Sequence, residues 1–127
     1  MNIDVKAWID KAEGDFRVAL RELAVTDEAA FDAVCFHAQQ CIEKLLKAIL
    51  MQGRVEPPYT HNLLELADLV VRLHPTLDLD RSDLRFLTRG GVLFRYPGES
   101  ATALHAGKAM ELCKRLRAVL LRNLGTD

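Results

Sequence analysis

Hydrophobic positions recur at helical spacing along almost the whole chain. In residues 4–23, for example, Val5, Ile9, Ala12 and Phe16 fall on one face of a helix. Comparable stripes predict helices over residues 4–23, 27–53, 60–74, 83–94 and 100–125, the fourth being shorter and weaker. No stretch alternates like a strand between turn signals, apart from a weak "GGVLF". The pattern predicts an all-α fold, an antiparallel up-down bundle of four main helices plus a short helix.

Residues that favour helix ends mark the predicted boundaries. Side-chain oxygens of Asp, Thr and Ser accept hydrogen bonds from free N–H groups at a helix start, and Gly or Pro favours the stop. The signals are Asp27, Thr60 and Ser100 at the starts, and Gly53, Pro75 and Gly125 at or just after the ends. The pair Gly90-Gly91 is expected to interrupt the fourth helix.

The apolar stripes of neighbouring helices must face one another, so they also predict the core. We expect burial of Trp8, Phe16, Ala38, Ile42, Leu45, Ile49, Leu112, Leu116 and Val119. The cysteines sit among apolar neighbours and lack the spacing of a metal site. We therefore expect buried, reduced thiols at Cys35, Cys41 and Cys113.

Length and composition indicate one domain over residues 1–127. Half of the residues are apolar and the net charge is −1, so overall charge gives no general attraction to nucleic acid or to anionic lipid, and any such binding would need a local patch. There is no run of about 18 apolar residues and no signal-peptide core at the start. We expect a cytoplasmic protein that binds neither membranes nor DNA, and no motif indicates a cofactor or a metal site.

The predicted helix over residues 27–53 carries unusually many polar groups beside its apolar face. On a helical wheel His37, Gln40, Lys44 and Lys47 line one flank of that face, and Gln39 and Glu43 line the other. Two polar stripes are therefore expected to border the core. An imidazole, an amide and a cation together could bind an anion, so the first stripe favours a ligand site. The second stripe is equally well explained as an ordinary solvated flank.

Two loops supply further candidates. Two prolines precede His61, which would lie in the first turn of the third helix, where free N–H groups favour anions; a plain capped loop is the alternative. In "FRYPGES", residues 94–100, Pro97 holds Tyr96 extended. The planar guanidinium of Arg95 suits a phosphate or carboxylate, although it could instead pair with Glu99.

The last predicted helix adds a histidine and several cations. His105 shares a face with apolar residues, so it is expected to point inward, where a histidine can serve either packing or function. A basic edge runs along the same helix, which is either solvated surface or a contact for phosphates. It comprises Lys108, Lys114, Arg115, Arg117 and Arg122.

The segments "FHAQQCIEKLLKAILMQGRVEPPYTHNLLEL" and "FRYPGES", taken in order, resemble the HEPN domain family. The name denotes a nucleotide-binding domain of prokaryotes and higher eukaryotes, and the "RYP" turn is similar to a subgroup of small stand-alone prokaryotic members. The resemblance covers nearly the whole chain, beginning with Trp8 and "AEGDF". It implies four main helices plus a short one, a homodimer, and association with a small nucleotidyltransferase, as in a toxin–antitoxin pair.

Many members of that family are ribonucleases, which carry an Arg and a His separated by four to six residues. Here nine residues separate Arg95 from His105, and the six between Arg54 and His61 span the proline loop. The resemblance therefore favours a non-catalytic accessory protein that binds a nucleotide or RNA through His37, Gln40, Lys44, His61, Arg95 and Tyr96. The alternatives are a metal-independent endoribonuclease using Arg95 and His105, and a structural dimerisation module.

Overall fold

The computed structural model describes residues 2–125, and these form five helices. They are α1 (Ile3–Leu23), α2 (Phe31–Gln52), α3 (Leu63–Leu73), α4 (Arg81–Leu93) and α5 (Ala103–Leu124). No strand occurs among the described residues, and "GGVLF" lies mostly within α4. The predicted all-α bundle is confirmed.

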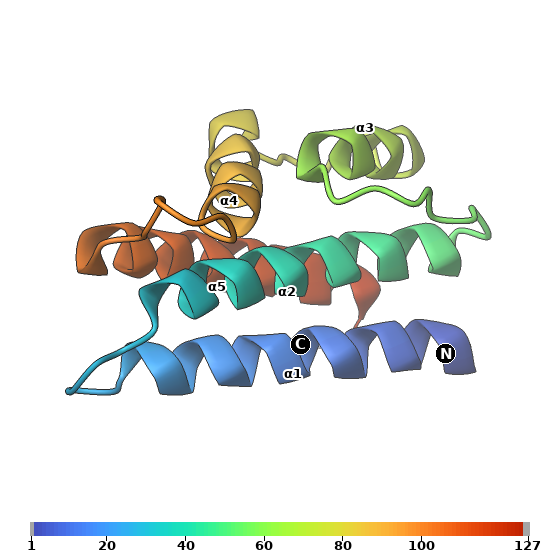
Figure 1. Ribbon diagram of the computed structural model, residues 1–127. Coiled ribbons are helices and arrows are strands. Elements are labelled where there is room, and N and C mark those ends of the chain that lie inside the picture. Colours follow the sequence, from blue (N-terminus) through green and yellow to red (C-terminus); the bar gives the residue numbers. More distant parts are fainter. Residues whose placement is uncertain (1, 126–127) are drawn as a thin grey trace.

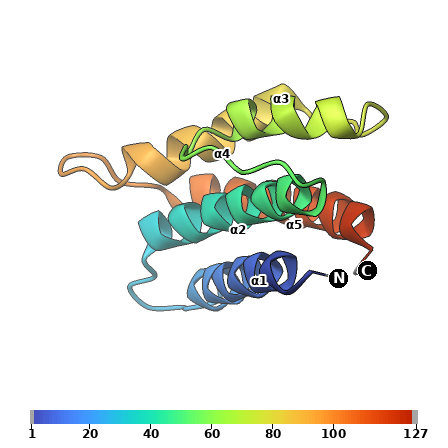
Figure 2. The same cartoon turned by 90° about the vertical axis from the view of Figure 1, so that its right-hand side faces the viewer.

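The helices form three layers (Figures 1 and 2). α1 makes one outer layer, α2 and α5 lie side by side in the middle, and α3 and α4 form the other outer layer. α1 and α2 are antiparallel, whereas α2 and α5 run in the same direction. That direction follows from two contacts, because Asp32 binds the backbone N–H of Ala101 and Cys41 meets Cys113 further along both helices. α2 consequently touches every other helix, and thirteen of its 22 residues are buried.

Side-chain caps start four of the five helices, although not always where the sequence signals suggested. The carboxylate of Asp80 accepts hydrogen bonds from two backbone N–H groups and begins α4, two residues earlier than predicted. Asn62 caps α3 instead of Thr60, whose hydroxyl accepts a hydrogen bond from the Asn62 N–H in the preceding turn. Thr102 caps α5 instead of Ser100. In each case the residue directly before the first helical residue supplies the cap, because its side-chain oxygen accepts a hydrogen bond from an N–H group of the first turn.

The predicted start of α2 at Asp27 is wrong, because the helix begins at Phe31. The intervening residues form the turn that reverses the chain after α1. Glu28 has a φ of 53°, which is incompatible with a right-handed helix, and the carboxylate of Glu22 binds the backbone N–H of Ala30. The stop signals Gly53, Pro75 and Gly125 do lie at the expected ends, with Gly125 in the left-handed conformation.

Two further expectations need correction. α4 continues through Gly90-Gly91, since both glycines pack against α2 and the tertiary contact outweighs their low helix propensity. Trp8 and Val119 are only half-buried, because each lies at the edge of its helix's apolar face. The other predicted core residues are buried, as are the three free cysteines. No helix within residues 2–125 is long and apolar enough to cross a membrane.

Candidate anion-binding site

An ion-pair cluster joins α1 to α2 and uses two of the predicted ligand-binding residues. Asp15, which is 9 % exposed, lies between them. One of its carboxylate oxygens is 2.7 Å from His37 Nδ1, and the other is 2.5 Å from Lys44 Nζ. Since an internal acid already binds both groups, His37 and Lys44 have their first partner within the fold.

A second polar network lies on the side of α2 that faces α3 and the proline loop. Its centre is Glu43, whose side chain is 4 % exposed. Glu43 Oε2 accepts a hydrogen bond from Lys47 Nζ at 3.0 Å, and Glu43 Oε1 is 2.9 Å from both Gln39 Nε2 and His61 Nδ1. Gln40 Nε2 joins through Gln39 Oε1 at 2.9 Å. The network ties the loop before α3 to the middle of the bundle.

The expectation that polar stripes merely border the core is therefore wrong for three residues of α2. Gln39, Glu43 and Lys47 are buried. The reason is that α1, α3, α4 and α5 together surround α2, so a flank that would be solvated in a simple bundle is covered here. Buried charges of this kind persist only when they are paired, which the Glu43–Lys47 contact provides.

Arg95 and Tyr96 lie outside both networks. They follow the end of α4 and are exposed, Tyr96 to 64 %. The Arg95 guanidinium carbon lies 4.9 Å from the centre of the Phe36 ring, so this cation is held by an aromatic face on α2. Arg95 is therefore near the start of α2, where the same Phe36 ring also meets the His37 imidazole edge-on, with ring centres 5.2 Å apart.

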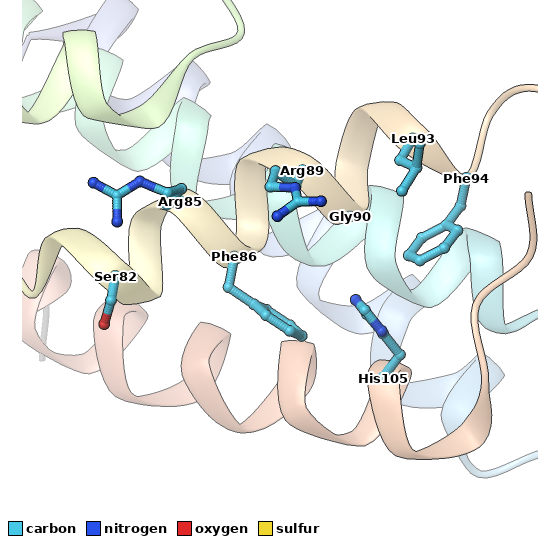
Figure 3. A pocket seen from close by; sticks show the side chains of 8 residues that line it. All are labelled: Ser82, Arg85, Phe86, Arg89, Gly90, Leu93, Phe94 and His105. Carbon is cyan, nitrogen blue, oxygen red and sulfur yellow. The ribbon is translucent and has the colours of Figure 1, made fainter.

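His105 lies in a surface pocket of about 310 Å³ between α4 and α5 (Figure 3). Its imidazole stacks on Phe86, with ring centres 4.6 Å apart, and meets the edge of Phe94 at 4.9 Å. Within residues 2–125 the imidazole nitrogens have no hydrogen-bonding partner. The two aromatic rings thus hold the imidazole in place while leaving its nitrogens available to a ligand.

Two arginines that sequence reasoning missed line the same pocket. Arg85 and Arg89 project from successive turns of α4 (Figure 3), and neither has a hydrogen bond or ion pair to another described residue. A third cation lies over one of the residues that line the pocket, because Lys108 Nζ is 4.5 Å from the centre of the Phe86 ring. A signal was present in the sequence, because arginines at i and i+4 share one face of a helix.

The part of the chain that forms this pocket is rich in basic residues. Residues 81–125 contain nine Lys or Arg and three Asp or Glu, whereas residues 1–80 contain eight and fourteen. Part of the predicted basic edge of α5 is neutralised, since Arg115 pairs with Asp83 and Arg117 with Glu13. Arg85, Arg89 and Lys108, by contrast, have no carboxylate partner among the described residues. No group of three potential metal ligands occurs within the described residues.

The chain was compared with known proteins. The HEPN domain family matches residues 5–124. Among solved structures, the fold is similar to that of TT1696 from Thermus thermophilus, with a TM-score of 0.75 and 21 % identity over 93 % of this chain and 96 % of that one. It is also similar to ST0689, an archaeal HEPN homologue, with a TM-score of 0.69 and 20 % identity over 94 % and 96 %. A comparison with curated proteins gives no match.

These findings define the class of protein to which the chain belongs. The family match spans nearly every described residue, and both similar structures share the all-helical bundle. The chain belongs to the HEPN domain family, as its "FHAQQ", "THNL" and "RYP" segments suggested.

Proposed function

We propose that this HEPN protein binds a phosphate-bearing ligand, a nucleotide or an RNA end, in the α4–α5 pocket. The observation that carries the proposal is that one pocket is lined both by two arginines without an acidic partner among the described residues and by an imidazole held between two aromatic rings. Guanidinium groups form paired, charge-assisted hydrogen bonds with phosphate oxygens. The Phe86 and His105 rings offer a flat apolar surface on which a base could stack.

The six residues that the sequence analysis predicted to bind a ligand do not line the α4–α5 pocket. Arg95 directly follows Phe94, so it is a candidate for contact with a longer ligand. His37 and Lys44 remain candidates only if a ligand displaces the carboxylate of Asp15, which costs the protein two ion pairs. His61 and Gln40 are likewise engaged by the Glu43 network.

Calorimetry with a mononucleotide and with a short single-stranded RNA tests the pocket. We expect Arg89→Ala and Arg85→Ala each to weaken binding by about tenfold, the loss of one good charged contact. Arg122→Ala, an exposed arginine on the last turns of α5, is the matched control and should bind normally. Affinity should fall steeply with added salt. Binding lost in Lys44→Ala but kept in Arg89→Ala would instead favour the groove along α2.

The proposal also includes partners. We infer that the protein forms a homodimer and acts as the accessory partner of a small nucleotidyltransferase. Light scattering should give a particle of twice the 14.3 kDa chain mass, and two-fold dimers are the commonest small oligomers. A particle of single-chain mass at micromolar concentration would contradict the dimer.

A second candidate function is a metal-independent endoribonuclease. It is favoured by the available nitrogens of His105, which could move a proton from a 2′-hydroxyl, and by the neighbouring arginines, which could stabilise the charge that develops on phosphorus. Cleavage of single-stranded RNA in the presence of a chelator tests it. We expect no efficient cleavage by the isolated protein. Cleavage that disappears in His105→Ala would establish the ribonuclease instead.

A further inference from the structure

A second groove lies on the flank of α4 next to the His105 pocket, with which it shares Arg89 and Leu93. It is about 370 Å³ in volume, and it is lined by Thr88, Arg89, Val92, Leu93 and Tyr96. Three of these are large apolar side chains that remain exposed, Val92 to 45 %, Leu93 to 38 % and Tyr96 to 64 %. Contiguous exposed apolar side chains on a small protein commonly mark an interaction surface.

The charges around this groove indicate what could cover it. Arg89 lines both the groove and the His105 pocket, and Arg85 lies one turn earlier on α4. The acid nearest to them in sequence, Asp83, is already paired with Arg115 on α5. The exposed apolar side chains therefore lie next to cations that have no carboxylate partner among the described residues.

A second copy of the chain is a poor occupant. A two-fold contact centred on this face would bring the same patch of both copies together, so Arg85 and Arg89 of one copy would meet the same arginines of the other. Like charges set against each other in an interface cost several kcal/mol. A partner that carries carboxylates beside apolar side chains would neutralise the arginines and cover the exposed side chains at once.

We infer that the α4 face formed by Thr88, Arg89, Val92, Leu93 and Tyr96 docks a segment of another protein that presents apolar side chains flanked by Asp or Glu. Tyr and Arg are enriched among the residues that dominate binding energy at interfaces, and this face offers both next to two aliphatic side chains. The inference rests on the part of the proposed function that assigns the protein a protein partner, and it names the chemistry of that partner's contact.

Nuclear magnetic resonance of the full ¹⁵N-labelled chain tests the inference with two synthetic amphipathic peptides. One is built from Leu and Glu, and its counterpart has Lys in place of every Glu. We expect the Leu/Glu peptide to shift the amide signals of residues 88–96 saturably and the Leu/Lys peptide to leave them unchanged. Shifts by both peptides, by neither, or in other residues would overturn the inference. Shifts of residues 88–96 that follow the protein's own concentration would assign the face to a second copy and would also overturn it.

Variants separate the docking face from the ligand pocket. Val92→Ser and Tyr96→Ala should each weaken binding of the Leu/Glu peptide by about tenfold. Tyr96 lies outside the helices, so its variant remains informative if Val92→Ser impairs folding. His105→Ala should leave peptide binding unchanged while reducing nucleotide binding. If the wild-type protein binds the Leu/Glu peptide as expected but binds no nucleotide, the proposed ligand site is refuted and the docking face is not.

Discussion

Two adjacent glycines in α4 should respond in opposite ways to the same substitution. A Cβ at Gly91 would lie 2.7 Å from both Cβ and Cγ of Gln39 on α2. At Gly90 the nearest atoms would be Cys35 Cβ at 3.7 Å and a Phe94 ring carbon at 3.8 Å, which are ordinary contacts. The Gln39 Cβ is fixed to the backbone of a buried helix, so it cannot rotate away from an added methyl group.

The magnitude follows from two opposing effects. Replacing a mid-helix glycine by alanine favours folding by about 0.5–1 kcal/mol. Overpacking a tight contact costs about 1–3 kcal/mol. Gly90→Ala should be stabilised by about 0.5–1 kcal/mol, because only the helix-propensity effect applies there. Gly91→Ala should be destabilised by about 1–2 kcal/mol, because overpacking outweighs that gain. The shift of α4 needed to admit the methyl group would also strain the hydrogen bonds of Gln39 to Glu43 and to the His61 carbonyl.

Urea unfolding followed by circular dichroism measures the difference. With a slope of about 1–3 kcal/mol per molar urea, Gly91→Ala should unfold at a midpoint about 0.5–1 M lower than wild type, and Gly90→Ala at an equal or higher one. All proteins must be compared at one concentration, because self-association would raise apparent stability. A Gly91→Ala protein as stable as wild type would refute the packing of α4 on Gln39.

Two further predictions concern buried charge and thiols. Asp15→Asn should cost about 1–3 kcal/mol of unfolding free energy, because it leaves the partly buried Lys44 ammonium without its counter-charge and removes the carboxylate that binds His37. Asp10→Asn, at an exposed ion pair, should cost less than about 0.5 kcal/mol, and equal losses in urea melts would contradict this. Burial and nearby Asp32 raise the pKa of the Cys35 thiol from 9.0 to about 11. All three thiols are buried, so they should react slowly with a disulfide reagent at pH 8 and quickly in urea, and rapid native labelling would show the cysteines to be accessible. The stability that neutral Cys35 confers should be complete below pH 9.0 and lost as the pH rises toward 11, because the unfolded thiol ionises first.

Much of the fold could be predicted from the sequence because helical periodicity is a local property. The five helical segments, the buried cysteines and the stops at Gly53 and Gly125 depend on neighbours within one or two turns. The ordered "FHAQQ", "THNL" and "RYP" segments indicated the family without any knowledge of tertiary contacts. The predicted starts of α3, α4 and α5 were one to three residues off because several nearby residues could serve as caps. The start of α2 was misplaced because the turn after α1, with Glu28 at positive φ, extends to Ala30.

The tertiary structure alone decided which polar groups are buried and which cations meet. A helical wheel treats α2 as having one covered face, but four other helices surround it, so Glu43 and Lys47 become a buried pair. Asp15 could not be assigned to His37 and Lys44 from spacing, since its helix is separated from theirs by a turn. Packing of α4 on α5 brings Arg85 and Arg89 into one pocket with His105, about sixteen to twenty residues away in the chain. Periodicity within one helix shows which of its faces is apolar, but not which other helix that face will contact. The candidate site depends on that second fact, because it lies between α4 and α5.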